Sequence, residues 1–444
     1  MHAQPSPSGA PRRAFLKTLG ASLIGAPFIA RELFANPPSS RVRYASIGAS
    51  GQAWTDLSAI ARGKNVEVTA VCDVDTANMA RAKRDFPKAR FYQDWRELLD
   101  KEAAHIDCAG VCTPDHMHAP IGMSLMQLGK PIYCQKPLAH SLYEVRRLAE
   151  LAKEQKLVSQ MGIQCHSAGP YRLAVRLLRE GIIGKISEVH SWNYKTWGDS
   201  GTLPNRNDRV PSSLAWDLWL GVRLKRPYIH DGYYHPGNWR KRLDFGTGTL
   251  GDMACHIFDP IFGGLGLAAP THVRSEGEAP KATNWMPDAK VVYTFAPTAH
   301  TDASGLRLTW TDGQRTVADI VTQTLGTRKR PNEGSLLIGS KGAMLLPHVG
   351  LPVLLPEEQY REKYRERGLD HWQQFVDAVR GLDTTQADFA YSGPLTEAVL
   401  LGGVASRFPE TTLTWDSAQL KFDHPAANTH THREYRKGWE VNGL

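Results

Sequence analysis

The chain has 444 residues, 41% of them hydrophobic and 22% charged, so a large buried core and about two domains of roughly 100–200 residues each are expected. The formal net charge is +8, but the lysines and arginines are scattered rather than gathered in one basic run, and nucleic-acid binding is therefore not expected. The six cysteines include no Cys-x-x-Cys pair, which argues against a zinc site.

The first 40 residues have the pattern of an export signal. Arg12-Arg13 is followed by Phe15-Leu16-Lys17 and by an apolar stretch, 18–30, that is too short to span a bilayer. We predict a twin-arginine signal peptide and linker over residues 1–40. The protein is then exported to the periplasm, where it can be membrane-peripheral but has no stable membrane insertion. A plain secretory signal and an uncleaved anchor have a similar outline.

Short apolar runs alternate with amphipathic stretches between residues 41 and 165. Ser141 stands as a suitable N-cap before apolar residues at helical spacing. The predicted strands are 42–47, 66–72, 106–113, 131–134 and 157–163, and the predicted helices are 53–62, 76–86, 116–128 and 141–154. This alternation predicts an α/β domain with a doubly wound parallel sheet.

A glycine-rich turn joins the first predicted strand to the first helix. In a dinucleotide-binding domain this turn brings the pyrophosphate close to the backbone and to the helix N-terminus. Asp73 ends the next strand, where a carboxylate can accept hydrogen bonds from both ribose hydroxyls and would repel a 2′-phosphate. NAD is therefore favoured over NADP. The candidate cofactor residues of this region are Gly48, Ser50, Gly51, Gln52, Ala53 and Asp73.

Two further polar segments follow predicted strands at the same edge of the sheet, which is where open α/β sheets bind ligands. Lys136 in Gln135-Lys136-Pro137 would place an ammonium group beside the nicotinamide and the substrate, although an isolated Lys-Pro is also common in surface turns. The candidate cofactor residues of these segments are Thr113, Pro114, His116, His118, Gln135 and Lys136.

The pattern changes after residue 165, and we predict a second, α+β domain over 166–444 with an open, mostly antiparallel sheet. Its predicted strands are 186–194, 290–295, 306–310, 315–321 and 336–338, and its predicted helices are 371–379 and 394–406. A long insert, residues 198–241, is rich in proline, asparagine, arginine and aromatic residues. Its aromatic side chains could stack on sugar faces or only pack the domain interface.

An Asp-x-x-x-His pattern follows the glycine-rich segment 246–248. If residues 250–262 are helical, Asp252 and His256 share one face, and Asp252 can polarise His256 as a general base. The alternative is a capped helix with a core histidine. The pair could also bind a metal together with His116 and His118, but no third carboxylate closes such a site, so no metal is predicted.

These four segments together resemble the Gfo/Idh/MocA family, over about residues 41–439. The resemblance implies an N-terminal Rossmann domain and a C-terminal sheet that commonly mediates oligomers, hence a homo-oligomer through the C-terminal sheet. It also implies catalytic roles for Lys136, Asp252 and His256. The family usually has glutamate where this chain has Gln135. Segments 216–221 and 234–240 look like the exported bacterial branch, which also resembles glycoside hydrolase family 109.

The residues and the resemblance lead to three hypotheses. The first is an NAD(P)-dependent oxidoreductase that transfers hydride between a ring carbon of a carbohydrate and nicotinamide. The second is a redox-neutral glycosidase that oxidises the sugar, eliminates the leaving group, adds water and reduces the ketone, with NAD tightly bound. Tyr194, Tyr234, His166 and His190 are candidates for its extra acid–base role. The third is a non-catalytic sugar-binding protein. The predicted substrate residues are His166, Tyr194, Tyr234, Trp239 and Arg240.

Overall fold

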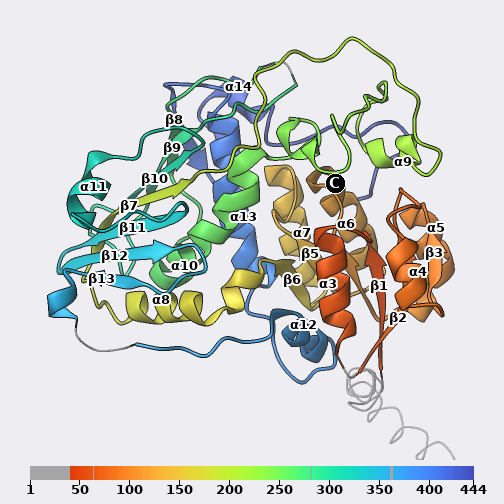
Figure 1. Ribbon diagram of the computed structural model, residues 1–444, viewed down its shortest axis with the longest axis horizontal. Coiled ribbons are helices and arrows are strands. Elements are labelled where there is room, and N and C mark those ends of the chain that lie inside the picture. The colour runs from red at the N-terminus through yellow and green to blue at the C-terminus, as the bar shows by residue number, and fades with distance from the viewer. Residues whose placement is uncertain (1–40, 64, 282, 361–363) are drawn as a thin grey trace, which may run out of the picture.

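The computed structural model describes residues 41–63, 65–281, 283–360 and 364–444. The predicted signal peptide, residues 1–40, lies outside the described residues. Two sheets lie at opposite ends of the molecule, and helices fill the space between them (Figure 1). No helix in the described part is long and apolar enough to cross a membrane.

The N-terminal sheet has six parallel strands in the order β3-β2-β1-β4-β5-β6, which is the doubly wound arrangement of a Rossmann domain. All its predicted strands are present, and β3 is an addition that the sequence pattern did not indicate. The strands are β1 (Val42–Ile47), β2 (Val66–Cys72), β3 (Arg90–Tyr92), β4 (Cys108–Val111), β5 (Ile132–Gln135) and β6 (Ser159–Gly162).

Helices connect these parallel strands. The predicted N-cap Ser141 is confirmed, since its side chain accepts from the backbone of Glu144, whose side chain reaches back in a capping box. The helices are α3 (Gln52–Ala61), α4 (Ala80–Asp85), α5 (Trp95–Glu102), α6 (His118–Gln127) and α7 (Leu142–Glu154).

The C-terminal sheet has nine strands in the order β13-β12-β11-β7-β10-β9-β8-β14-β15. Neighbours pair antiparallel except β7 and β10, which run parallel. The strands are β7 (Ile186–Asn193), β8 (His272–Ser275), β9 (Lys290–Phe295), β10 (Leu306–Asp312), β11 (Gly334–Gly339), β12 (Gly342–Pro347), β13 (Val353–Leu355), β14 (Thr412–Asp416) and β15 (Lys421–Phe422). The mixed, mostly antiparallel sheet confirms the predicted fold class.

One strand prediction for this domain is wrong. Residues 315–321 do not form a strand, because the helix α11 (Asp319–Leu325) begins within them. Val317, Val321 and Leu325 bury their side chains with Trp192 and Leu336 of the sheet. Val321 and Leu325 are four residues apart and lie on one side of α11, so the apolar pattern there is helical rather than alternating.

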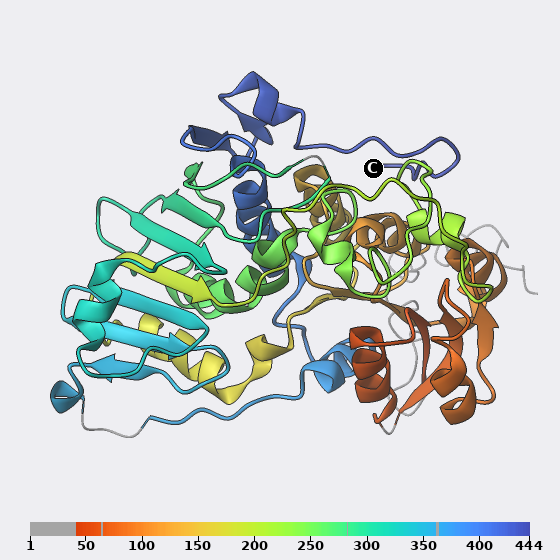
Figure 2. The ribbon, with the colours of Figure 1, turned by 45° about the horizontal axis from the view of Figure 1, so that its top comes forward.

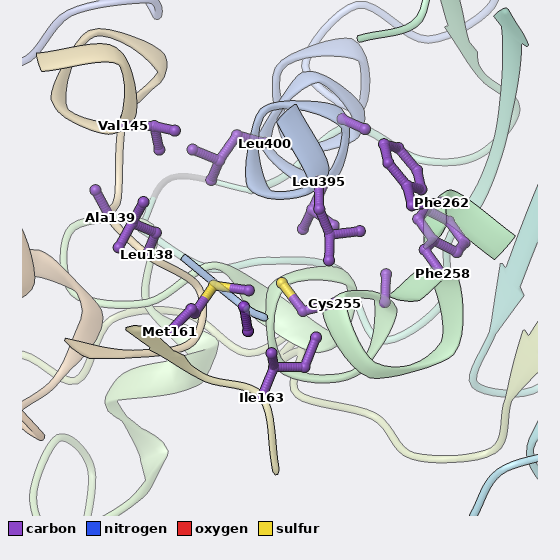
Figure 3. Packing of buried hydrophobic residues seen from close by; sticks show 14 of the residues in the cluster. Leu138, Ala139, Val145, Met161, Ile163, Cys255, Phe258, Phe262, Leu395 and Leu400 are labelled. Carbon is purple, nitrogen blue, oxygen red and sulfur yellow. The ribbon is translucent and has the colours of Figure 1, made fainter. Parts of the chain in front are cut away.

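Helices α8 (Gly169–Arg179), α10 (Cys255–Leu265) and α13 (Phe389–Ala405) fill the region between the sheets. Figure 3 shows α13 between Phe258 and Phe262 of α10 on one side and Val145 of α7 on the other. Cys255 is completely buried in this cluster. The residue that follows it, His256, is therefore anchored by the core of the molecule rather than by a surface loop.

Two late segments return to the N-terminal domain. Helix α12 (His371–Val379) packs against α3, and Trp372 donates from Nε1 to Asp56 of α3 at 2.9 Å. The last residues, 429–444, cross from the C-terminal domain and end beside α6 and α7 (Figure 2). The six cysteines are free, and all but Cys112 are buried.

Candidate functional site

A cavity of about 720 Å³ extends from the glycine-rich turn after β1 to the first turn of α10. It lies at the carboxyl ends of the parallel strands, where doubly wound sheets bind their ligands. Among the predicted site residues, the structure brings these to its walls: Gly48, Ser50, Gly51, Gln52, Ala53, Asp73, Thr113, Pro114, Gln135, Lys136, Trp239, Arg240, Asp252 and His256.

The turn after β1 fits the pyrophosphate of a dinucleotide. Gly48 has a φ of 110°, and a Cβ there would lie 2.5 Å from the carbonyl oxygen of Cys112, so no other residue fits the close approach of β1 and β4. Gly51 has a φ of 56° and has open space around it, and it stands directly before α3. The backbone N–H groups at the start of α3 can therefore receive an anion.

Asp73 lies at the end of β2, beside this turn. Its carboxylate accepts hydrogen bonds from the backbone N–H groups of Ala49 at 3.0 Å and Asp75 at 2.9 Å, and from Asn78 at 3.1 Å. Burial raises the pKa of the Asp73 carboxyl, although these donors counteract it. A fixed carboxylate at the cavity wall is suited to a ribose diol.

Two predicted cofactor residues lie behind the cavity wall. His118 joins two loops, since its ring nitrogens lie 2.8 Å from the carbonyl oxygens of Thr113 and Pro137. His116 is fully buried, and its Nε2 lies 3.0 Å from the carbonyl oxygen of Trp219. Burial lowers the pKa of His116 well below its usual value. Neither histidine lines the cavity.

Lys136 and Asp252 form an ion pair at the opposite end of the cavity. The Lys136 ammonium donates to Asp252 Oδ1 at 2.9 Å and to the Asp252 carbonyl oxygen at 2.5 Å. Trp197 Nε1 donates to Oδ2 at 2.8 Å, and Arg240 Nε lies 3.4 Å from Oδ1. Burial opposes ionisation of Asp252, but Lys136 and Arg240 outweigh it and hold the pKa of the carboxyl far below its usual range.

The predicted support of His256 by Asp252 is not what the contacts show. Residues Leu250–Ala254 form a π-helix ahead of α10, and π-helical hydrogen bonds join i to i+5. Asp252 and His256, which are i and i+4, are therefore not placed as α-helical neighbours. No hydrogen bond joins them among the described residues, and His256 Nδ1 has no partner there. Asp252 instead fixes Lys136.

His256 lines the cavity and is 6% exposed. Burial first, and then the charge of Lys136, hold the pKa of His256 well below its usual value, so the imidazole is neutral at neutral pH. A neutral imidazole beside an ammonium can accept a proton from a substrate hydroxyl.

Two cavity residues, His348 and Lys195, were not predicted from the sequence. His348 follows β12, and its ring centroid lies 5.8 Å from that of His256. Burial and the charges of Lys195 and Lys136 lower the pKa of His348 to about 4. Lys195 follows β7 and lies 3.2 Å from the sulfur of Met253. Neither residue belongs to a sequence motif. They reach the site only because the folded chain brings their segments together.

Gln135, which replaces the glutamate usual in the family, is hydrogen-bonded to a carboxylate. Its Nε2 donates to Asp56 Oδ2 at 2.8 Å, and its Oε1 accepts from the Lys136 backbone at 3.1 Å. Tyr133 and Trp372 donate to the other oxygen of Asp56. Burial raises the pKa of Asp56 despite the hydrogen bonds from Trp372 and Gln135. A carboxylate therefore still stands behind Gln135 in this chain, on α3.

The insert, residues 198–241, closes the ribose end of the cavity. Leu214 pairs with Asp75 in an isolated bridge, the Thr76 N–H donates to the Ser213 carbonyl oxygen at 2.9 Å, and His235 Nε2 lies 3.2 Å from Asp75 Oδ2. Most of its aromatic rings form a separate small core. Only Trp219 and Trp239, of the tyrosines and tryptophans of the insert, line the cavity.

Three predicted substrate residues do not line the cavity. Tyr234 is 3% exposed within the small core of the insert. Tyr194 is 55% exposed, beyond the end of β7. His166 Nδ1 is bound to Asp259 Oδ1 at 2.8 Å. His190, the other acid–base candidate, instead pairs with Glu188 at 3.1 Å. In the described part of the chain, no group of three or more His, Cys, Asp or Glu side chains could hold a metal ion.

Some curated proteins match part of the chain. Levoglucosan dehydrogenase of Pseudarthrobacter phenanthrenivorans is 26% identical over 180 residues, which is 40% of this chain and 38% of that protein. Alpha-N-acetylgalactosaminidase of Bacteroides fragilis is 24% identical over 164 residues, which is 35% of this chain and 38% of that protein. The matched stretch thus spans about two fifths of the length of either relative.

Solved structures share the fold over most of the chain. The WlbA dehydrogenase from Bordetella pertussis, in complex with NADH and UDP-GlcNAcA, aligns with a TM-score of 0.61 at 14% identity, covering 85% of this chain and 99% of that one. GenD2 from gentamicin A biosynthesis, in complex with NAD, aligns with a TM-score of 0.58 at 16% identity, covering 86% of this chain and 98% of that one.

Two family models match in chain order. Residues 42–163 match the oxidoreductase family with an NAD-binding Rossmann fold, and residues 174–441 match the C-terminal alpha/beta domain of the same family. The glycine-rich turn, Asp73 and the pair Lys136–Asp252 lie in one cavity between these two parts. The chain therefore belongs to the Gfo/Idh/MocA family of oxidoreductases.

Proposed function

We propose that the protein is an NAD-dependent oxidoreductase acting on a hydroxyl-bearing ring carbon of a carbohydrate. The observation that carries this proposal is the neutral imidazole of His256 in one cavity with the Lys136–Asp252 pair and the dinucleotide turn. Similarity to a levoglucosan dehydrogenase supports a sugar substrate. NAD, when bound, accepts and returns hydride.

His256 would accept the hydroxyl proton of the substrate. The Lys136 ammonium, held by Asp252, donates a hydrogen bond to the same oxygen and stabilises the negative charge that develops on it. Trp197 and Arg240 keep the Asp252 carboxylate ionised and oriented, so that it stays paired with Lys136. Trp239, which carries the Arg240 guanidinium 4.3 Å from its ring centroid, offers an aromatic wall for a sugar face.

A redox-neutral glycosidase is the second candidate, because the cavity holds two neutral imidazoles. His256 can serve the hydroxyl proton, and His348 can serve the C2 proton that becomes acidic next to a ketone. The similarity to an alpha-N-acetylgalactosaminidase supports the same reading. His348 replaces the four acid–base candidates predicted from the sequence, which lie outside the cavity.

We also propose that NAD is tightly held and that the protein is exported. The insert covers the segment directly after Asp73, so release of a dinucleotide requires the contacts of residues 213–215 with 74–76 to break. The Arg12-Arg13 leader supports folded export, in which a retained cofactor travels with the protein. Little free NAD is available outside the cytoplasm, which favours a recycled cofactor. Homo-oligomerisation through the C-terminal sheet remains part of this proposal.

The test uses the purified full chain. NAD content is measured first, and then free sugars and aryl glycosides are supplied without added cofactor. Reduced nicotinamide that accumulates stoichiometrically on free sugars, without bond cleavage, supports the oxidoreductase. Aglycone release with solvent deuterium at C2 supports the glycosidase instead. Sugar binding without either reaction, unchanged in His256→Ala, would leave only a binding protein.

A further inference from the structure

A second cavity, of about 480 Å³, lies on the far side of the turn 246–248 from the active site. Five segments form its walls: the start of α7, the insert with the residues directly after it, Thr283 with Trp285, the second half of α13 with Arg407, and the tail, residues 429–436. We call it the basic cavity. It shares no lining residue with the cavity that holds Lys136 and His256.

Arginines dominate its ionisable groups. Four arginines line it against two carboxylates, Asp244 and the exposed Glu434. Asp244 is already bound by both Arg223 and Arg226. Arg436 is paired with Asp217 at 2.7 Å, outside the cavity lining. The lining arginines are Arg223, Arg407, Arg433 and Arg436.

Three of these arginines have a buried nitrogen without a hydrogen-bond partner in the described chain: Arg223 Nε, Arg433 Nη1 and Arg436 Nε. Arg433 donates from Nη2 to the Asp244 carbonyl oxygen at 3.1 Å, but its buried Nη1 has no hydrogen-bond partner in the described chain. The nearest carboxylate oxygen, Glu144 Oε1, is 3.9 Å away and already accepts from Tyr435 at 2.8 Å. Arg407 lies over the Trp285 ring at 5.4 Å, with no hydrogen bond or ion pair to the residues that the structure describes.

Burial and the positive charge of the basic cavity shift the pKa values of its ionisable groups. Burial lowers the pKa of Arg407, and the pKa of the buried His140 is held well below its usual value by burial and by Arg433 and Arg223. His140 Nδ1 is buried without a hydrogen-bond partner among the described residues. Partly desolvated cations whose hydrogen-bond donors are not all used are costly, and an anion in the cavity would relieve that cost.

We propose that the basic cavity binds a phosphate ester of a small polar molecule. A phosphate group carries three strong acceptor oxygens, which can serve guanidinium groups that converge from α13 and from the tail, whereas a carboxylate presents two oxygens in one plane. The cavity is larger than a phosphate group requires, and Thr247, Thr283 and Thr429 supply hydroxyls for the remainder of the ligand. This site is separate from the proposed reaction and does not depend on it.

Hydrogen bonds in the wall between the two cavities could transmit the effect of a bound ligand to the proposed active site. The Gly246 carbonyl oxygen accepts from Trp285 Nε1 at 2.8 Å and lies 3.1 Å from His140 Nε2. Thr247 Oγ1 donates at 2.7 Å to Asp115, which lines the cavity that holds Lys136 and His256. A ligand that orders Arg407 beside Trp285 would therefore also order the turn that leads to Asp252.

Calorimetric titration of the full chain, saturated with NAD so that the dinucleotide site is filled, tests the proposal. The probes are inorganic phosphate, glycerol 2-phosphate and citrate at matched ionic strength. We expect both phosphates to bind, and glycerol 2-phosphate to bind more tightly than inorganic phosphate. Citrate should bind at least about tenfold more weakly than glycerol 2-phosphate. Arg407→Gln and Arg433→Gln should each weaken phosphate binding about tenfold, because each removes one charge-assisted hydrogen bond.

The exposed Arg62→Gln on the outer end of α3 is the matched control, and it should bind as the unaltered chain does. Arg407→Lys keeps the charge and guards against loss of folding. The proposal is overturned if the NAD-saturated protein binds no phosphate. It is equally overturned if citrate binds as well as glycerol 2-phosphate, or if Arg407→Gln and Arg433→Gln are both folded and both bind phosphate as tightly as Arg62→Gln.

Discussion

The reaction centre that we propose depends on three side chains whose charges are set by one another. Asp252 is ionised because Lys136 and Arg240 face it, Lys136 is fixed because Asp252 holds it, and His256 is neutral because it is buried near that ammonium. A base that is neutral at neutral pH accepts a proton without first losing one. The activity should therefore fall only at acidic pH.

Replacing His256 by alanine removes that base. We expect kcat to fall by about 10²–10⁴-fold while NAD binding is unchanged, since general-base catalysis is worth that much and the imidazole lies away from the glycine-rich turn. For the unaltered protein, the rate should stay level from neutral pH through the usual imidazole range and should fall only at clearly more acidic pH, because the pKa of His256 is held well below its usual value. Steady-state kinetics against pH, with His105→Ala as the surface control, measures both effects.

Gln135 offers a second test at the residue scale. Gln135→Glu would place a second carboxylate 2.8 Å from Asp56, and we expect a loss of unfolding free energy of about 2 kcal/mol or more. A carboxyl whose folded pKa is raised binds more protons in the folded state, so stability falls as pH rises and the loss should be larger at about pH 8 than at about pH 5.

A second-site change separates charge from packing. In Gln135→Glu combined with Asp56→Asn, the asparagine can donate to the new carboxylate, and most of the lost stability should return. Denaturant unfolding of both variants decides the matter. If the double variant is no more stable than the single one, the loss is not electrostatic, and the exchange of charge between β5 and α3 has another cause.

Elements outside the Rossmann sheet decide how the cavity is closed. The insert pairs with the chain directly after Asp73 through His235 and residues 213–215. His235→Leu should speed NAD dissociation about tenfold, because it removes one hydrogen bond to an acidic partner. Release can be followed by stopped-flow fluorescence. His230→Leu, at an exposed site of the same insert, should leave the rate unchanged, and equal rates in both variants would argue against closure by the insert.

Helix α12 stabilises the Rossmann domain from the other side. Trp372→Phe keeps the ring but removes the 2.9 Å hydrogen bond to Asp56, which should cost about 1–3 kcal/mol of unfolding free energy. Trp54→Phe on α3 is the control, since Trp54 is partly buried and packs on Phe86. Equal effects of the two substitutions in chemical denaturation would mean that packing, and not the carboxylate contact, fixes α12.

Some of these elements could be predicted from the sequence, and others could not. Local periodicity and the Gly48–Asp73 spacing were enough to predict the parallel strands other than β3, and the dinucleotide turn, because both depend on short segments. The π-helix before α10 was beyond reach, since Leu250–Ala254 carry no sequence signal for an i to i+5 pattern. His348 and Lys195 reach the cavity, and Asp56 reaches Gln135, through contacts between segments that are distant in sequence. Such contacts cannot be predicted from the pattern of a single sequence.

At the scale of the whole molecule, the two sheets are held together by a shared core and by late segments that return to the Rossmann domain. The proposed active site lies where both domains contribute: Lys136 from one, and Asp252 and His256 from the other. Relative motion of the domains would separate the base from the dinucleotide turn, so the continuous core around Cys255 and Leu395 supports catalysis by rigidity.

The most direct test is a single-turnover experiment on the purified full chain with its NAD in place. A panel of free sugars and aryl glycosides is added without further cofactor, and nicotinamide absorbance is recorded together with aglycone release. The account predicts that a carbohydrate reduces the bound cofactor, transiently or stoichiometrically, and that His256→Ala abolishes the signal while retaining NAD. A signal that survives in His256→Ala, or a protein that neither binds NAD nor reacts with any sugar, would contradict it.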